Sequence, residues 1–209
     1  MKDTPKYDAP ASETEYQAKS SNRVLKNTLG ITEPAEMNDV ESELLLKLYE
    51  KIFIQNPGIE QLQLDTVLSW HKQWLANIYP AWAGRLRSTN ISKDGFTFAA
   101  ANQLERLLTT FEDDFLAAFK SLPLMSRQNI VELLAKSHVE FILIHPFREG
   151  NGRISRLLID VMAEKAGYGV LDYKLWDEHK EFYIRSIQAG VSGDYQHMIR
   201  LMDDILPAD

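Results

Sequence analysis

The chain has 209 residues, of which 44% are hydrophobic and 25% are charged, as expected for one globular domain with a sizeable core. Its net charge is −7, from 23 basic and 30 acidic residues, which argues against nucleic-acid binding. The chain has no cysteine and no apolar run near the roughly 20 residues of a membrane span, so disulfides, thiol chemistry and membrane insertion are not expected.

The first 21 residues differ in character from the rest of the chain. Residues 1–21 are polar and carry little periodicity, which is typical of a flexible lead-in. From residue 22 to residue 206 no repeat, low-complexity tract or linker interrupts the sequence. We therefore predict a flexible N-terminal lead-in over 1–21 and a single domain over 22–206.

Helical signals cover most of the predicted domain. Thr32 is predicted as the N-cap of a first helix, with Pro34 in its first turn and Asn56-Pro57-Gly58 at its end. The segment before residue 145 is apolar nearly all round, which indicates a buried central helix. Apolar residues recur with helical spacing in the other segments, and further helices are predicted over 64–78, 101–120, 126–144, 153–166 and 177–205, the last with breaks near Gly190 and Gly193.

One segment breaks this helical rhythm. Between Ile91 and Ala99 an Asp94-Gly95 pair is flanked by apolar residues, a pattern typical of a short β-hairpin with a tight turn. The alternative interpretation is that this hairpin is a surface feature without a functional role. The predicted fold is mostly α-helical with one short β-hairpin.

A polar sequence with unusual chemistry lies between the two most apolar predicted helices. It reads His-Pro-Phe-Arg-Glu-Gly-Asn-Gly-Arg-Ile-Ser-Arg over residues 145–156. Glycines on either side of an asparagine allow successive backbone amides to turn toward one anion, and a helix predicted to start near residue 153 adds its positive end. The pattern indicates a phosphate-binding loop held between two core helices.

The side chains of this segment fit transfer of a nucleotide to a hydroxyl group. His145 is the candidate general base, because its ordinary pKa lies near neutrality. Glu149 is the candidate Mg²⁺ ligand. Phosphate contacts are expected from Gly150, Asn151, Gly152, Arg153 and Arg156, the two arginines sharing one helical face. The alternatives are a helix-capping histidine, a solvated glutamate, an ordinary turn and surface salt bridges.

Residues 145–156 resemble the signature of the Fic (filamentation induced by cAMP) family, His-Pro-Phe-x-Asp/Glu-Gly-Asn-Gly-Arg-x-x-Arg, and match it at every position that the signature specifies. Looser similarity extends over roughly residues 22–206. The resemblance implies a Fic-type helical bundle with a hairpin flap, and a protein adenylyltransferase that moves AMP from ATP-Mg²⁺ to a Ser, Thr or Tyr of a target protein. Tyr183 and Gln188 are possible residues of an adenine-binding wall. The flap residues that would hold the target as an added strand are Lys93, Phe96, Thr97, Phe98 and Ala99.

Other reactions in this family remain open from the sequence. Transfer of phosphate from ATP, as in the Doc toxins, is disfavoured by Gly152, because those proteins have lysine at this position. Transfer of UMP or phosphocholine, and removal of AMP, are further alternatives. A non-enzymatic helical interaction module is the alternative from a different class.

The resemblance also raises the question of inhibition. Many relatives carry a Ser/Thr-x-x-x-Glu motif whose glutamate pairs with the second arginine. Here only Thr32 and Glu36 have that spacing, at a predicted helix start. We therefore expect Arg156 to be available to ATP in the isolated chain, and a small antitoxin protein to act on it, as in a toxin–antitoxin pair. A cytoplasmic site of action, or delivery into a host cytosol, is expected, with no nucleic-acid or membrane partner.

Several conspicuous residues are predicted to be structural or peripheral. His138 is interpreted as a core histidine rather than half of a metal pair. Arg148 occupies the variable position of the motif and is expected to face solvent. Core anchors are expected at Trp70, Trp74, Trp82 and Phe147.

Overall fold

The computed structural model describes residues 15–55 and 58–208, and these residues form two compact units. The described part of unit 1 comprises residues 15–55, 58–59, 65–104 and 146–149. Unit 2 comprises residues 60–64, 105–145 and 150–208. Most of the expected lead-in, residues 1–14, and the Asn56-Pro57 part of the expected helix end lie outside the described residues.

The first helix of unit 1 begins at a proline. Helix α1 spans Pro34–Tyr49 and continues as the π-helical segment η1, Glu50–Gln55. Its N-cap is Glu33, with φ −93° and ψ 125°, so the prediction of Thr32 is wrong by one residue. Proline disfavours the helical conformation of the residue before it, which makes Glu33 the last extended residue.

Helix α2, Leu64–Leu75, supplies the rest of the helical core of unit 1. It ends three residues before the predicted limit, and residues 76–78 form a turn. Trp70 and Trp74 are buried as predicted, and the indole N–H of Trp74 donates to the main-chain oxygen of Glu41 in α1 at 2.8 Å. Trp82 is only partly buried, so its expected role as a core anchor holds in part.

The described end of the expected lead-in is hydrogen-bonded to the residues that follow it. Tyr16 and Leu25 form an antiparallel bridge, and the Gln17 amide donates to the Val24 carbonyl oxygen at 2.8 Å. Residues 15–17 therefore pair with residues 24–26. The boundary after residue 21 stays a prediction.

The hairpin of unit 1 matches its sequence pattern. Strand β1, Ser92–Lys93, pairs antiparallel with β2, Phe96–Thr97. Asp94 and Gly95 have φ values of 51° and 78°, which are the two positive angles of the tight hairpin turn that Asp-Gly favours. The short 3₁₀ segment η2, Ala101–Gln103, follows. The predicted hairpin is confirmed.

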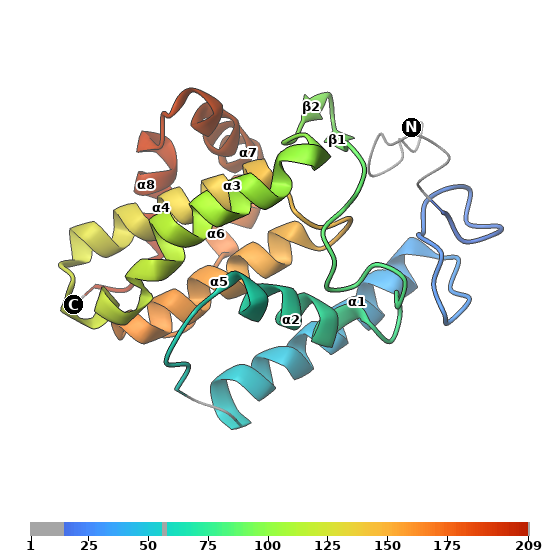
Figure 1. The fold of residues 1–209 in the computed structure, drawn as a ribbon, viewed down its shortest axis with the longest axis horizontal. Coiled ribbons are helices and arrows are strands. Elements are labelled where there is room, and N and C mark those ends of the chain that lie inside the picture. Colours follow the sequence, from blue (N-terminus) through green and yellow to red (C-terminus); the bar gives the residue numbers. More distant parts are fainter. Residues whose placement is uncertain (1–14, 56–57, 209) are drawn as a thin grey trace. The chain divides into compact units, whose positions relative to one another are not determined.

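Unit 2 is built around helix α4, Arg127–Ile144, which packs against helices α5, α7 and α8 (Figure 1). The Ser126 hydroxyl caps its start by accepting from the Asn129 amide. Nine residues of α4 are buried, so the prediction of a central buried helix is confirmed. The remaining elements of unit 2 are α3 Leu104–Phe111, η3 Glu112–Leu116, η4 Ala117–Leu124, α5 Asn151–Ala166, α6 Lys174–Glu178, α7 Lys180–Ala189, η5 Gly190–Ser192 and α8 Gln196–Ile205.

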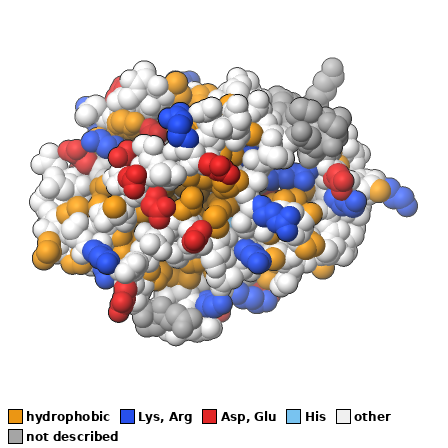
Figure 2. Space-filling model, viewed as in Figure 1, with side chains coloured by type: hydrophobic (Ala, Val, Ile, Leu, Met, Phe, Trp, Pro, Cys, Tyr) orange, Lys and Arg blue, Asp and Glu red, His pale blue; other side chains and the backbone are white. Residues whose placement is uncertain are grey.

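The predicted fold class, mostly α-helical with one hairpin, is confirmed by these elements. The region predicted as one helix over 101–120 is instead divided among 3₁₀, α and π segments. Within the described ranges, no helix is both long and apolar enough to cross a bilayer. On the face seen in Figure 2, acidic and basic side chains are interspersed with apolar ones, and neither sign covers the face alone.

Candidate functional site

His145 ends helix α4 in a left-handed conformation. Its φ and ψ are 51° and 60°, values that are uncommon outside glycine and that cluster at functional sites. The residue is 6% exposed, and Nδ1 lies 3.0 Å from the Ile142 carbonyl oxygen. A carbonyl oxygen only accepts, so Nδ1 carries the proton and the lone pair of the neutral ring is on Nε2. His145 thus caps its helix and also has the tautomer of a base acting through Nε2.

The glycine-flanked asparagine forms the start of helix α5. Gly150 is the N-cap, with φ 81°, a conformation that favours glycine. The first α-helical bond runs from the Ile154 amide to the Gly150 oxygen at 3.0 Å, so the helix starts at Asn151, two residues before the predicted start. The amides of residues 151–153 lie at the positive end of the helix dipole. A Cβ added at Gly152 would meet no atom within 4 Å, so the space beside it is open.

Arg156 lies one turn further along α5 and is engaged by a carboxylate. Its Nη2 donates to Asp177 Oδ1 at 2.6 Å and its Nη1 donates to Oδ2 at 3.3 Å, a two-point contact. The guanidinium also lies over the Tyr173 ring, 4.8 Å from its centre. The expectation that Arg156 is available in the isolated chain is therefore wrong. Asp177 lies 21 residues away on α6, so no local spacing pattern indicates the pair.

A buried hydrogen-bond chain connects α5 with α4 and α7. His138 in α4 is 0% exposed, and its Nδ1 and Nε2 each lie 2.8 Å from a hydroxyl oxygen, of Ser155 and of Tyr183. This confirms the interpretation of His138 as a core histidine. The Tyr183 ring stacks on Trp176 with centres 5.2 Å apart, while Gln188 is exposed. Tyr183 is thus held by His138 through its hydroxyl and by Trp176 through its ring. That Tyr183 and Gln188 form an adenine-binding wall stays a prediction.

His138 predicts a pH dependence of stability. Burial, together with the charge of Arg156, lowers the pKa of His138 from 6.5 to about 3 in the folded chain. The unfolded chain therefore binds the proton more readily. This stability is fully present above pH 6.5 and is lost as the pH falls toward 3. We expect the free energy of unfolding to fall by up to about 1.4 kcal/mol per pH unit in this window.

Urea unfolding at several pH values between about 7 and 4 measures this slope. His138→Gln should flatten it, because glutamine binds no proton in this range. An unchanged slope in the variant would assign the acid sensitivity to other groups.

Residues Pro146–Glu149 belong to unit 1 and are held there at both ends. The Arg87 amide donates to the Pro146 oxygen at 2.9 Å. The Gly84 amide donates to His71 Nδ1 at 2.8 Å, so His71 carries its proton on Nε2, which donates to the Glu149 main-chain oxygen at 3.1 Å.

The His71 ring is also stacked on Phe147. Their ring centres are 3.8 Å apart and the planes are inclined by 2°, and both residues are fully buried. Phe147 is thus the core anchor that was predicted. His71 is not among the residues predicted from the sequence, although its place in the apolar stripe of Val67, Trp70 and Trp74 was a usable signal.

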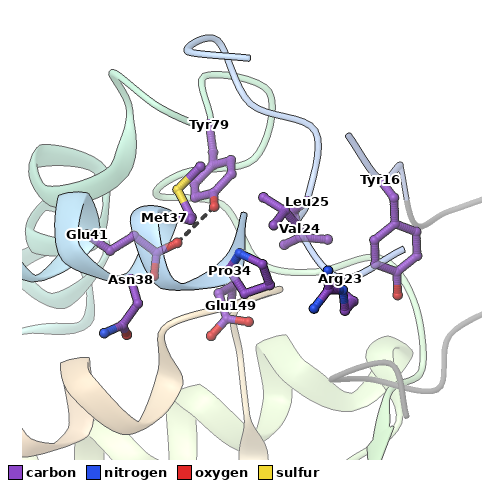
Figure 3. A pocket seen from close by; sticks show the side chains of 10 residues that line it. All are labelled: Tyr16, Arg23, Val24, Leu25, Pro34, Met37, Asn38, Glu41, Tyr79 and Glu149. Carbon is purple, nitrogen blue, oxygen red and sulfur yellow. Dashed lines mark hydrogen bonds between the residues drawn. The ribbon is translucent and has the colours of Figure 1, made fainter. Parts of the chain in front are cut away.

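Glu149 is 6% exposed and lines a cavity of about 190 Å³ within unit 1 (Figure 3). Glu41 also lines it, accepting a hydrogen bond from the Tyr79 hydroxyl at 2.8 Å. The remaining lining residues are Tyr16, Arg23, Val24, Leu25, Pro34, Met37 and Asn38. The buried carboxyl of Glu149 is therefore held beside a small, partly polar space, and is not a solvated loop residue.

Arg148 differs from its prediction. It is half-buried, and its guanidinium carbon lies 5.9 Å from the centre of the Trp82 ring. Burial lowers the pKa of Arg148. The expectation of a solvent-facing side chain is wrong, because the flat guanidinium can pack on an aromatic face where a more strongly hydrated ammonium would remain in water.

The predicted flap residues lie in and directly after strand β2 of unit 1. Lys93 and Thr97 are exposed, whereas Phe96, Phe98 and Ala99 are partly buried. The rings of Phe96 and Phe98 meet edge to face, with centres 5.4 Å apart. The hairpin is confirmed as a structure, and its role in binding a target stays a prediction.

Taken by unit, the candidate residues fall into two groups. Unit 2 contains His145, the turn Gly150–Asn151–Gly152, both arginines and the two adenine-wall candidates. Unit 1 contains Glu149 and the flap. Glu149 directly precedes Gly150 in the chain, so the motif is continuous in sequence.

Comparison with known proteins identifies relatives of this chain. Residues 61–163 match the sequence model of the Fic/DOC family. The chain is 29% identical over 157 residues to protein adenylyltransferase Fic of Nematostella vectensis, covering 75% of this chain and 35% of that protein. It is 31% identical over 169 residues to protein adenylyltransferase VbhT of Bartonella schoenbuchensis, covering 79% of this chain and 34% of that protein.

A solved structure shares the fold. The BepC protein of Bartonella tribocorum, a VirB-translocated effector with bound AMPPNP, superposes with a TM-score of 0.71 at 22% identity, covering 88% of this chain and 93% of that one. The chain spans about a third of the length of the two curated relatives.

Proposed function

Because the chain belongs to the Fic/DOC family, we propose that it is a protein adenylyltransferase, which transfers AMP from ATP to a Ser, Thr or Tyr hydroxyl of a target protein. The observation that carries the proposal is the conformation of His145. Its Nδ1 proton is committed to the Ile142 carbonyl oxygen, which leaves Nε2 as the basic atom. This histidine ends α4 six residues before Asn151, the start of the proposed phosphate-binding helix α5.

The first turn of α5 is suited to the triphosphate of ATP. The residues at the positive end of its dipole include Gly152, whose open side leaves room for a phosphate group. A resident lysine at this position would fill that space and favour another nucleotide orientation. Binding of a triphosphate analogue to BepC, a relative of the same fold, is in keeping with this assignment.

The side chain of Glu149 fits a magnesium ligand. Mg²⁺ is usually held by one or two carboxylates together with phosphate oxygens and water, and a dedicated protein cage is not required. Among the described residues, no cluster of three or more His, Cys, Asp or Glu side chains suited to a metal occurs. When bound, the ion would offset charge on the phosphates, and Glu149 would be its protein ligand.

The chemical step then divides among residues of the motif. The target hydroxyl oxygen attacks the α-phosphorus, and its proton passes to His145 Nε2. The bond between the α-phosphorus and the bridging oxygen breaks, and pyrophosphate leaves with the bonding electrons. The helix start with Asn151 would hold the α-phosphate, while Arg153 and Arg156 would offset charge on the departing group.

Labelled ATP added to the purified chain and a cell lysate tests this function. AMP carrying the α-phosphate label should appear on protein, and mass spectrometry should locate it on a hydroxyl side chain. Label transferred from the γ-position would favour phosphorylation instead. The absence of any protein label would contradict the proposal.

The Arg156–Asp177 pair predicts a modest gain of nucleotide affinity on its removal. Asp177 uses the two Nη groups that a phosphate would use. The side chains are 27% and 64% exposed, so the pair contributes at most about 1 kcal/mol. We expect Asp177→Asn to tighten ATP binding by up to about fivefold, measured by calorimetry.

The neighbouring Glu178→Gln is the matched control, because Glu178 contacts Lys174 and lies outside the Arg156 pair. Adenosine, which lacks phosphates, should bind both variants equally. Weaker ATP binding by Asp177→Asn would show that Asp177 orients Arg156 for the nucleotide instead of competing with it.

Regulation by a small antitoxin remains part of the proposal, in a changed form. A partner carboxylate that acts on Arg156 would have to displace Asp177, and a weak exposed pair permits this. Action in a cytosol remains the expected location. The VirB-translocated relative BepC is the reason to keep delivery into a host cell as an alternative.

A further inference from the structure

Arg87 lies at the base of the β1–β2 hairpin and bridges its two ends. It is 6% exposed. Its Nη1 donates to the carbonyl oxygen of Thr89, before β1, and its Nη2 donates to that of Ala99, after β2, each at 2.5 Å. One side chain therefore ties together the chain entering the hairpin and the chain leaving it.

The same residue connects the hairpin base with the motif segment. The Arg87 main-chain amide donates to the Pro146 oxygen at 2.9 Å. Pro146 is the first residue of the 146–149 segment that ends at Glu149. Both connections lie within unit 1, so one residue is bonded to the flap through its side chain and to the motif segment through its backbone.

The hairpin itself is too small to fix its own position. Each strand has two residues, and an isolated two-stranded hairpin is marginally stable in water. Beyond the two strands, the Phe98 amide donates to the Ile91 oxygen at 3.2 Å, and the Ala101 amide donates to Asn90 Oδ1 at 2.8 Å. The Arg87 bridge adds a charge-assisted contact at the same base, and such contacts are stronger than those between neutral groups.

Arginine is required for this geometry. Its planar fork presents several N–H groups in fixed directions, so two carbonyl oxygens can be held at once, whereas a lysine ammonium is a point charge on a flexible stem. Burial lowers the pKa of Arg87 to about 10, so the guanidinium remains charged at neutral pH. Burying a charge is costly, which makes its use as simple core filling unfavourable.

We propose that Arg87 is a positioning residue that holds the flap in register with the 146–149 segment, and thereby governs capture of the target protein and not of ATP. The inference rests on the proposed function, in which residues 96–99 bind the target as an added strand. Loosening the flap would misplace the hydroxyl while leaving the helix start of α5, in unit 2, unaltered.

The test uses Arg87→Lys in the full chain, with exposed Arg85→Lys as the matched control. Three quantities are measured: hydrogen exchange of the Phe98 and Ala101 amides, affinity for AMPPNP, and AMP incorporation into lysate proteins. In Arg87→Lys we expect exchange to accelerate by about tenfold or more. Protein labelling should fall by at least about tenfold, while AMPPNP affinity stays within about twofold. Arg85→Lys should match the wild type in all three.

A cross-strand disulfide separates positioning from a general loss of folding. Ser92 and Thr97 lie opposite each other in the hairpin. The next pair, Ile91 and Phe98, is hydrogen-bonded, and bonded and non-bonded pairs alternate along an antiparallel hairpin. Ser92 and Thr97 are therefore a non-bonded pair, whose Cα atoms are close enough for a disulfide. The natural chain has no cysteine, so Ser92→Cys with Thr97→Cys gives a single bridge. Oxidised, this bridge should restore slow exchange of the Phe98 and Ala101 amides in Arg87→Lys, and reduction should remove the rescue.

Unchanged flap exchange in Arg87→Lys, or a loss of AMPPNP affinity as large as the loss of labelling, would overturn the assignment. Failure of the oxidised bridge to slow the exchange of the Phe98 and Ala101 amides would do so as well. Absence of labelling by the wild-type chain would instead contradict the proposed function. The exchange measurement still tests whether Arg87 holds the flap in that case.

Discussion

Replacing His145 with alanine is expected to lower AMP transfer by on the order of 10²–10⁴-fold, the usual contribution of a general base. The Nδ1–H group donates to the Ile142 carbonyl oxygen, so the basic atom is Nε2, and alanine removes it. Affinity for ATP should change by less than about twofold, because the proposed base acts on the target hydroxyl and not on the nucleotide. Rates of label transfer and calorimetric ATP binding, measured on the same preparation, check both parts.

Two variants keep this result interpretable. His145→Asn should be equally inactive and well folded, because asparagine tolerates the left-handed conformation found at φ 51°. His179→Ala, at an exposed histidine, should transfer AMP at the wild-type rate. Near-normal transfer by a folded His145→Ala chain would show that the histidine serves only to cap α4, the alternative that the sequence left open.

Elements with strong local signals were predicted well from the sequence. Helix α4 is apolar nearly all round and is the central helix of unit 2, and its end was indicated by the proline after His145. The hairpin followed from Asp94-Gly95, because few residue pairs accept two positive φ angles in succession. In both cases the determinant is a short stretch of sequence, which periodicity and turn chemistry can detect.

Partner choice between distant polar residues could not be predicted in this way. Arg156 pairs with Asp177 across 21 residues, and His71 bonds to the Glu149 backbone across 78. Sequence spacing carries no information about such pairs, because they depend on how whole helices pack. Arg148 shows the same limit, since its burial beside Trp82 depends on the tertiary position of that ring.

The motif therefore predicted the composition of the site better than its electrostatic state. The charged residues of the motif were identified from the sequence. Arg156, however, was expected to be available to ATP or to a partner protein, and it is instead paired with Asp177. An exposed pair of this kind is weak. We therefore expect ATP to compete with Asp177 for Arg156 without a separate activating event.

Replacing Gly152 with lysine is expected to reduce AMP transfer by on the order of 10²-fold, comparable to the loss of one preorganised contact to the reacting group. Gly152 is the second residue of α5, and a Cβ there would meet no atom within 4 Å. The lysine should therefore fold without a clash, and its side chain would enter the space that the proposal assigns to a phosphate. Transfer rates and the thermal midpoint of unfolding, measured together, separate loss of chemistry from loss of fold.

Gly152→Ala is the matched control, because it removes the glycine but adds only a methyl group. Alanine is also favoured over glycine in a helix by up to about 1 kcal/mol, so this variant should be at least as stable as the wild type and should retain most of its activity. If Gly152→Lys transfers AMP at the wild-type rate, the α-phosphate does not lie beside Gly152 and the proposed nucleotide orientation is wrong. If alanine is as damaging as lysine, the backbone freedom of glycine is what the reaction needs. A gain of phosphate label on protein in Gly152→Lys would show that the space beside residue 152 decides which phosphorus is attacked.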